Sequence, residues 1–251
     1  MYCLMQVIPI SDVIQFFDLN YLIKKGIPKV DYHMHTQFSD GIGSIQEYLQ
    51  SAENKGLTSF AITDHVWKTS YWLDDYFNEI DMVRESSSTK IFSGVEAKQI
   101  NINGEIDLDS KYTSKLDLVL GAVHALPTDI DYLFLDPKKL SPIEILEVET
   151  ESIIGLIRNK QVKIIAHPFI MYKKYVDAPV PNEAIEKVVN CAVKNNVAIE
   201  LNGKYSLPDI DFLKLALQRG AKLSFGSDAH KPSDIGKIPY FYVEQILEDL
   251  N

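Results

Sequence analysis

The sequence predicts an α/β fold built around a parallel β-sheet, either open or closed into a barrel. The chain has 251 residues, a length that a single α/β barrel commonly occupies. Short β-branched runs alternate with segments of helical periodicity, and this alternation is typical of parallel sheets covered by helices. Six histidines lie at, or shortly after, the ends of predicted strands, where α/β barrels build their active sites.

The first 27 residues are predicted to form an extra helix ahead of the alternating part. Ser11 suits the N-cap position, and Gly26 suits the residue that ends a helix. Apolar residues between them share one helical face, namely Val13, Phe16, Phe17 and Tyr21. We expect this extension, residues 1–27, to pack against the barrel. The whole chain, residues 1–251, is expected to form one domain because no Pro/Gly/Ser-rich linker divides it.

Seven short runs are predicted as strands because they are rich in β-branched and other apolar residues. They are residues 29–32, 59–62, 90–95, 118–121, 163–166, 197–201 and 222–225. Segments with helical periodicity lie between most of them, at residues 45–54, 74–84, 143–159, 182–195 and 210–219. An Asn-Gly pair at 103–104 predicts a hairpin after the third strand, and residues 127–142 are expected to form a loop over one face.

Composition and charge limit the classes of function. The net charge of -10 and the pI near 5.1 repel nucleic acid phosphates and anionic membranes, so long nucleic acid is not an expected partner. Cys3 and Cys191 are too few for a disulfide framework. The N-terminus lacks the features of a signal peptide, and no run of ~18 apolar residues could span a membrane. We therefore expect a cytoplasmic protein, and the sequence leaves its oligomeric state open.

The histidines occur in short patterns that suit metal binding. His33 and His35 are two residues apart at the end of a predicted strand. Side chains at i and i+2 of a strand point to the same face, so both imidazoles can reach one ion. Asp228 and His230 repeat this spacing with a carboxylate and an imidazole, and His65 follows the predicted strand at 59–62.

The remaining candidate ligands complete a set of nine. His124 follows a strand, and His167 precedes Pro168, which predicts an extended backbone at His167 because a residue before proline is disfavoured in helical space. Three carboxylates lie in register with the six histidines, namely Asp40, Glu96 and Asp228. Imidazole with carboxylate suits zinc, manganese or iron better than calcium. Nine ligands are too many for one ion and suit two or three divalent transition metals.

These motifs resemble those of the PHP family, which is named for polymerase and histidinol phosphatase. The similar segments are DYHMHTQFSDG at 31–41, ITDH at 62–65, SGVEAK at 93–98, GAVHAL at 121–126, AHP at 166–168 and GSDAH at 226–230. The resemblance covers residues 28–240. It implies a distorted TIM-like (β/α)7 barrel with a trinuclear metal centre.

The resemblance also implies how the ligands are shared among three ions. One ion would be held by His33, His35, Glu96 and Asp228. Glu96 would bridge to a second ion, which His124 and His167 bind. The third ion would be held by Asp40, His65 and His230.

The activity that the resemblance implies is hydrolysis of a small phosphorylated substrate by a metal-bound hydroxide. Residues 197–236 resemble the histidinol-phosphatase branch in particular, which implies a role in histidine biosynthesis. That branch tends to place an arginine shortly after the Glu-x-Asn segment, which is 200–202 in this sequence. The nearby cation here is Lys204, and the next arginine is Arg219, so the assignment of histidinol phosphate as substrate is weakened.

Roles are also predicted for side chains next to the ligands. Lys204 and Lys98 are the candidate substrate-binding residues, each acting as a point charge for a phosphate. The candidate catalytic residues are Asp64, Glu96 and Asp228. Asp64, beside His65, either orients a metal ligand or has a structural role at the strand end.

Three other functions stay open at this point. A nuclease or nucleotide phosphodiesterase would use the same metals, and so would a tyrosine-protein phosphatase of the same family. A module of a different class would bind metals without catalysis, as an accessory to another protein. A complete set of ligands in a chain of 251 residues argues against this last alternative.

Overall fold

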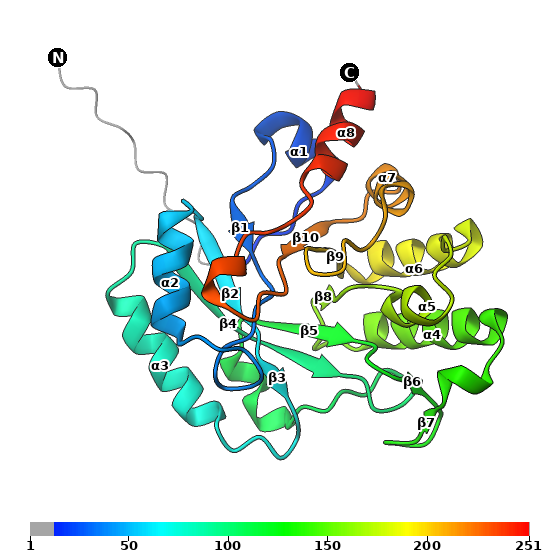
Figure 1. The fold of residues 1–251 in the computed structure, drawn as a ribbon, viewed down its shortest axis with the longest axis horizontal. Helices are drawn as coiled ribbons and strands as arrows, with labels where there is room; N and C mark the ends of the chain where they lie inside the picture. Colours follow the sequence, from blue (N-terminus) through cyan, green and yellow to red (C-terminus); the bar gives the residue numbers. More distant parts are fainter. Residues whose placement is uncertain (1–12, 251) are drawn as a thin grey trace.

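Parallel strands form the wall of a nearly closed barrel (Figure 1). The computed structural model describes residues 13–250, and within them seven strands follow one another around the wall. In spatial order they are β1 (Val30–Asp31), β2 (Ser59–Ile62), β4 (Lys90–Lys98), β5 (Leu118–Ala122), β8 (Ile164–Ile165), β9 (Ala198–Asn202) and β10 (Leu223–Gly226). A short strand, β3 (His65–Val66), continues the direction of β2 and pairs with β4. The predicted α/β barrel of seven strands is therefore confirmed.

The barrel closes where the chain's first strand meets its last. The Tyr32 N–H donates to the Phe225 carbonyl at 2.7 Å, and the Asp228 N–H donates to the His33 carbonyl at 2.8 Å. The second bond joins His33 to Asp228, and both of these residues are predicted metal ligands. Closure of the barrel therefore brings the first sequence motif against the last one.

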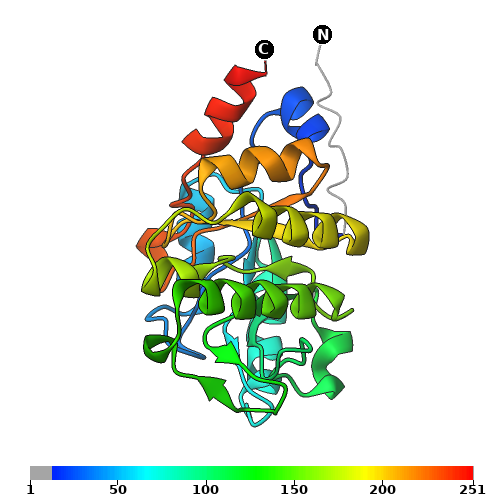
Figure 2. The same ribbon diagram turned by 90° about the vertical axis from the view of Figure 1, so that its right-hand side faces the viewer.

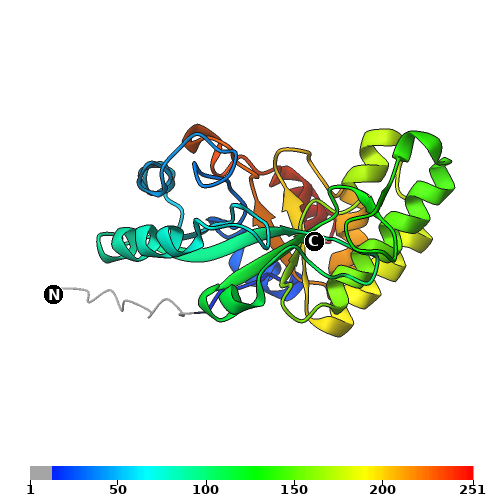
Figure 3. The same ribbon diagram turned by 90° about the horizontal axis from the view of Figure 1, so that it is seen from below.

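Helices cover the outside of the barrel on two sides (Figures 1 and 3). One side carries α2 (Ile45–Asn54) and α3 (Leu73–Glu85). The other side carries α4 (Pro142–Arg158), α5 (Ile170–Tyr175), α6 (Asn182–Asn195) and α7 (Ile210–Gln218), of which α4, α6 and α7 lie one above the other in Figure 2. The remaining helices are α1 (Leu19–Lys25) and α8 (Phe241–Asp249), with 3-10 turns at Ser110–Lys115, Pro137–Lys139 and Pro232–Asp234.

Local sequence explains where α2 and α4 begin. Ser44 caps α2 and Ser141 caps α4, and each serine takes part in a capping box with the glutamate three residues later. The strands β2, β5, β9 and β10 are buried along their whole length. Strands covered on both faces need apolar residues at consecutive positions, which is why they read as continuous runs in the sequence.

The N-terminal helix is shorter than predicted and begins later. Asp18 is its N-cap, and Gly26 ends it as predicted. The proposed cap at Ser11 lies outside the described residues. Phe17 does not join the helix but forms a backbone bridge with Leu223 at the start of β10, with its side chain buried. Backbone pairing with the sheet has overridden the helical pattern at this position.

Most other elements lie where the sequence predicts them, and the differences concern short segments. β3, α5 and α8 were not predicted. The hairpin around the Asn-Gly pair is reduced to a single bridge between Gln99 and Ile106. Residues 127–142 are not a plain loop, because β6 (Leu126–Pro127) pairs with β7 (Phe134–Leu135). None of the helices in the described part of the chain is long and apolar enough to cross a membrane.

Candidate metal centre

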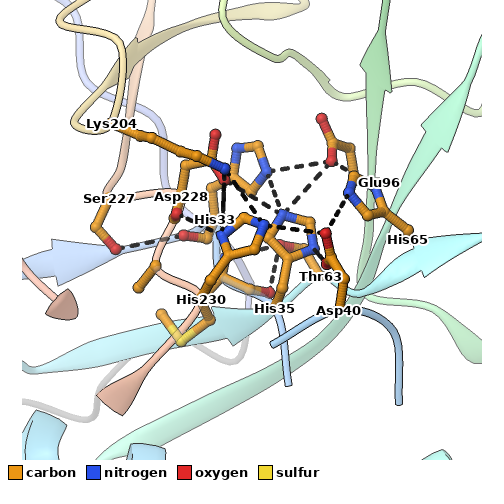
Figure 4. A network of polar contacts seen from close by, with 12 residues as sticks. His33, His35, Asp40, Thr63, His65, Glu96, Lys204, Ser227, Asp228 and His230 are labelled. Atoms are coloured by element: carbon orange, nitrogen blue, oxygen red, sulfur yellow. Dashed lines mark hydrogen bonds and ion pairs between the residues drawn. The ribbon is translucent and has the colours of Figure 1, made fainter. Parts of the chain in front are cut away.

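The nine predicted ligands converge at the carboxyl ends of the barrel strands, and most of them are visible in Figure 4. His33, His35 and Asp40 follow β1, His65 lies on β3, and Glu96 lies on β4. The others follow later strands, with His124 after β5, His167 after β8, and Asp228 and His230 after β10. Parallel strands bring their carboxyl ends to one rim, so residues up to 197 positions apart in sequence meet there.

Three overlapping groups of side chains bring potential ligand atoms within 4.8 Å of one another. Among the described residues, these groups are His35, Asp40, His65 and His230; His33, His35 and Asp228; and His65, Glu96 and His124. The groups share His35 and His65, as expected of neighbouring metal positions. Each group combines imidazole and carboxylate, which suits borderline transition metals.

Glu96 stands between two sets of histidines. Its Oε1 lies 3.2 Å from His124 Nε2 and 2.8 Å from His167 Nε2. Its Oε2 lies 2.9 Å from His65 Nδ1 and 3.4 Å from His33 Nε2. Each oxygen of this buried carboxylate therefore faces a different set of imidazoles.

Imidazole nitrogens without protein partners indicate that the cluster fits metal ions. Among the described side chains, Nδ1 of His35 and Nδ1 of His167 are buried with no hydrogen-bond partner. Nε2 of His33 faces Nε2 of His35 at 3.1 Å, and one proton at most can lie between two such nitrogens. Buried polar atoms are normally paired, so divalent ions would satisfy lone pairs that the protein alone does not.

The ionisation of Glu96, Asp228 and His35 suits metal binding. Although burial alone would raise the pKa of Glu96, the imidazoles of His124 and His33 hold it well below its usual range. Burial opposes the ionisation of Asp228 as well, but His33 and His35 keep its pKa below the usual range. Burial lowers the pKa of His35 to about 4. Both carboxylates are therefore charged and His35 is neutral at neutral pH, the forms in which these side chains bind metals. Although burial opposes it, nearby carboxylates raise the pKa of His33, His65 and His167, so each of these rings would release its proton on binding a metal.

Comparison with known proteins decides the family. A family model described as the PHP domain matches residues 31–204, more than half of the chain. The chain belongs to the PHP family. The resemblance drawn from the sequence motifs is thereby confirmed.

A curated relative supports the same grouping, and two solved structures are similar in fold. A probable phosphatase of Acetivibrio thermocellus is 30% identical over 232 residues, which are 88% of this chain and 87% of the relative. Histidinol phosphate phosphatase from Lactococcus lactis, solved with zinc, L-histidinol and phosphate, has a TM-score of 0.63 at 18% identity and covers 88% of this chain and 93% of its own. A provisionally named histidinol phosphatase from Listeria monocytogenes has a TM-score of 0.69 at 17% identity, covering 85% and 99%. Both structures share the fold.

Glu200 is a functional candidate that the sequence reasoning missed. Its Oε1 lies 2.6 Å from Nδ1 of His33, and its Oε2 accepts the backbone N–H of His167 at 2.7 Å. A histidine that donates one ring nitrogen to a carboxylate keeps the other nitrogen free for a metal. The available signal was an acidic residue in the middle of the buried apolar strand β9.

The prediction of an extended backbone at His167 is wrong. Its φ is +28°, outside the region that a residue before proline normally occupies. The bond from its N–H to Glu200 and the 2.8 Å contact of its ring with Glu96 hold it in this conformation. Asp228 also has a positive φ, of +55°. Such strained residues concentrate at functional sites, where the surrounding contacts over-determine them.

Asp64 supports the loop that carries Asp40. Its Oδ1 accepts the Thr36 N–H at 2.7 Å and the Ser39 hydroxyl at 2.6 Å, and its Oδ2 accepts the Thr36 hydroxyl at 2.7 Å. These contacts are with the loop after β1 and not with the ligand atoms. Of the two roles left open for Asp64, the geometry favours the structural one.

Of the two candidate lysines, Lys204 contacts the ligand cluster. Its Nζ lies 3.5 Å from Oδ1 of Asp228 and 3.3 Å from Nε2 of His230 (Figure 4). Lys98 lies at the end of β4, and its ammonium is 4.1 Å from the centre of the Phe134 ring. A substrate-binding role of Lys98 stays a prediction.

A small cavity opens beside Lys204. Its volume is about 240 Å³, and its lining includes Lys204, Asp228, His230 and Lys237. Two ammonium groups and two carboxylates, those of Asp228 and Asp234, therefore border the same space, and Lys237 pairs with Asp234 at 2.6 Å. A space of this size suits a small group beside the candidate metal ligands.

Proposed function

We propose that this PHP chain is a metal-dependent phosphomonoesterase of the histidinol-phosphatase type. The observation that carries the proposal is the position of Glu96, whose two oxygens face different sets of histidines at an open rim of the barrel. The names of the relatives, probable phosphatase and histidinol phosphate phosphatase, support the same class of reaction.

The nine rim residues would hold two or three divalent ions such as zinc, manganese or iron. When bound, such ions lower the pKa of a coordinated water and neutralise the oxygens of a phosphoryl group. Glu96 would keep two of the cations close together, because its negative charge offsets their mutual repulsion. Glu200 would hold the ring of His33 in the tautomer that leaves Nε2 free, since its carboxylate lies 2.6 Å from Nδ1.

Lys204 would bind a substrate phosphate next to the metals. Its ammonium already lies within 3.5 Å of two predicted ligands, and it is 40% exposed, so an incoming anion can reach it. The cavity of about 240 Å³ beside it suits a small phosphorylated substrate rather than a long polymer. The net charge of -10 also disfavours polyanions, because the phosphates of a long nucleic acid meet repulsion beyond the site.

A paired assay tests the proposed function. The purified protein, supplied with manganese, iron or zinc, should hydrolyse p-nitrophenyl phosphate faster than bis(p-nitrophenyl) phosphate. The two esters share a leaving group, so their rates compare monoester with diester cleavage. A faster reaction with the diester would favour a phosphodiesterase or nuclease, and no reaction with either would favour the metal-binding accessory module.

A further inference from the structure

One buried carboxylate of the barrel wall is not among the predicted ligands. Asp31 is the last residue of β1, and its side chain is fully buried. Burying a carboxylate costs free energy unless hydrogen bonds replace the water that it loses. The groups that Asp31 contacts therefore indicate why a carboxylate stands at this position.

Asp31 joins β1 to two parts of the segment that follows β10. Its Oδ1 accepts the backbone N–H of Ser227 at 2.8 Å, and its Oδ2 accepts the backbone N–H of Gly236 at 2.6 Å. These two partners lie 196 and 205 positions away from Asp31 in the sequence. Oδ1 also lies 3.4 Å from the backbone nitrogen of His33. One side chain therefore fastens the first ligand-bearing segment of the chain to the last one.

The bond to Ser227 bears on Asp228, a predicted ligand with a strained backbone. The φ of Asp228 is +55°, a conformation that residues other than glycine rarely adopt. The N–H of Ser227 is held by Asp31, and the next N–H, that of Asp228, donates to the His33 carbonyl at 2.8 Å. The carboxylate of Asp228 lies 3.5 Å from Nε2 of His35. Asp31 therefore stabilises the turn that presents this carboxylate to the metal centre.

The bond to Gly236 bears on the loop that borders the cavity beside Lys204. Gly236 immediately precedes Lys237, and the lining of this cavity of about 240 Å³ includes both lysines. A Cβ added to Gly203 would lie 1.9 Å from the Lys237 carbonyl oxygen, so the loop packs directly against the turn that leads to Lys204. The two oxygens of Asp31 therefore hold two segments that border the same cavity.

We propose that Asp31 is a positioning residue that holds Asp228 in place as a metal ligand and fixes the loop at 231–237 beside the same cavity. The proposal deepens the proposed function and rests on it for the metal ions. Asp31 would act through backbone N–H groups, so it needs no contact with the ions or with the substrate. A carboxylate is required, because each N–H group needs an acceptor oxygen of its own and an amide offers only one oxygen.

Substitution of Asp31 tests this role through metal affinity, which is measured without any substrate. Asp31→Ala releases both N–H groups, and Asp31→Asn releases at least one of them, since its amide nitrogen is a donor. We expect metal affinity to fall about 10- to 100-fold in Asp31→Ala and by less in Asp31→Asn, as for other groups that orient metal ligands. Competition with a chromophoric chelator for zinc gives the affinities.

Tyr32→Phe is the matched control for a loss of stability alone. Tyr32 follows Asp31 in the chain and is also buried, and its hydroxyl makes a hydrogen bond with that of Ser59 on β2 at 3.0 Å. Loss of this bond should lower the melting temperature and leave metal affinity unchanged. A fall in affinity that occurs in the Asp31 variants and not in this control therefore separates positioning of a ligand from general stabilisation of the barrel.

Amide hydrogen exchange of the metal-free proteins gives a second measurement, which also applies if Asp31→Ala does not fold. In Asp31→Asn, peptides that contain Ser227 or Gly236 should exchange faster than in the unchanged protein. Peptides from β2 should keep their rate, because the substitution leaves the backbone pairing of β1 with β2 intact.

Several outcomes would overturn the proposal. They are an unchanged metal affinity in the folded Asp31 variants, an equal loss of affinity in Tyr32→Phe, or unchanged exchange of both peptides in Asp31→Asn. Absence of metal binding in the unchanged protein would overturn both this role and the proposed function. If metal affinity falls as expected but the unchanged protein hydrolyses neither p-nitrophenyl phosphate nor its diester, the role of Asp31 is supported and the phosphomonoesterase function alone is overturned.

Discussion

At the scale of single residues, the site depends on carboxylates buried among imidazoles. Glu96 and Glu200 are each 1% exposed, and both contact His33 and His167. Burying a charge is costly unless opposite charges and hydrogen bonds surround it. The two glutamates face different atoms. Glu96 faces ring nitrogens of several predicted ligands, including Nε2 of His33, whereas Glu200 faces the other ring nitrogen of His33, Nδ1.

Substitution of Glu96 by glutamine should remove the bridge between two ions. The neutral amide cannot offset the repulsion of neighbouring cations, so we expect loss of at least one metal ion per chain. Turnover should fall by roughly 10³-fold or more, which corresponds to several kcal/mol of transition-state stabilisation. Elemental analysis and a phosphatase assay measure both effects, with Glu53→Gln on the exposed side of α2 as a control. Full metal occupancy with normal turnover would refute the bridging role.

Substitution of Glu200 by glutamine should weaken metal binding without removing a ligand. The amide cannot accept from both His33 Nδ1 and the His167 N–H, since one of its two polar atoms is itself a donor. We expect metal affinity to fall about 10- to 100-fold. Competition with a chromophoric chelator measures the affinity. Glu186→Gln serves as the control, because Glu186 pairs with Arg219 on the surface. Equal affinities in the two variants would exclude an orienting role for Glu200.

At the scale of elements, α5 depends on a side chain from α4. Glu149 is fully buried, and its two oxygens accept the backbone N–H groups of Met171 at 2.9 Å and Tyr172 at 2.6 Å. These N–H groups belong to the first turn of α5, which has no side-chain cap of its own. The carboxyl group of Glu149, on a neighbouring helix, therefore replaces the local cap, which explains why the helix could not be predicted from its own sequence.

The same contact predicts a pH dependence of stability. Burial raises the pKa of Glu149 to about 8, although the N–H groups of Met171 and Tyr172 oppose the shift. The folded protein therefore keeps a proton that the unfolded chain releases above its own pKa of 4.5. The stabilising contribution is complete below pH 4.5 and is lost as the pH rises to about 8, by at most ~1.4 kcal/mol per pH unit.

A glutamine at this position cannot titrate, so Glu149→Gln isolates the effect. The variant should be less stable than the unchanged protein at pH 5, by about 1–3 kcal/mol for a lost acceptor. The deficit should shrink as the pH rises towards 8. Denaturant unfolding of both proteins across this range measures the difference. A difference that stays constant with pH would contradict a raised pKa of Glu149.

At the scale of the whole molecule, bound metals should hold the first and last strands of the barrel wall together. The ligands come from β3 and β4 and from the segments after β1, β5, β8 and β10, so ions at the rim would link most of the wall. We expect two or three transition-metal ions per chain. Ligands that bind only the folded state stabilise it by about 2.7 kcal/mol at a concentration of 100 Kd.

Removal of the metals should therefore lower the melting temperature. For a chain of this size, a loss of this order corresponds to about 5–10 °C. Elemental analysis gives the metal content, and thermal unfolding before and after chelation, followed by addition of manganese, iron or zinc, gives the shift. One ion or none per chain, or a melting temperature that chelation leaves unchanged, would contradict this prediction.

The sequence by itself determined the local features of this protein. Apolar runs identified the seven strands, helical periodicity identified α2, α3, α4, α6 and α7, and histidines at strand ends identified the rim. These features could be predicted because each depends on neighbours within a few residues, through side-chain periodicity and strand termination. The resemblance of the motifs to the PHP family implied the barrel, which the structure confirms, and a grouping of the ligands, which stays a prediction.

Only the tertiary structure decided which side chains support the ligands. Glu200 and His33 are 167 positions apart, and Glu149 reaches α5 from another helix. The positive φ of His167 follows from its contacts with Glu96 and Glu200, which override the local preference set by Pro168. Closure of the barrel creates these contacts, because it brings distant strand ends within hydrogen-bond distance, and no local pattern records which of them will meet.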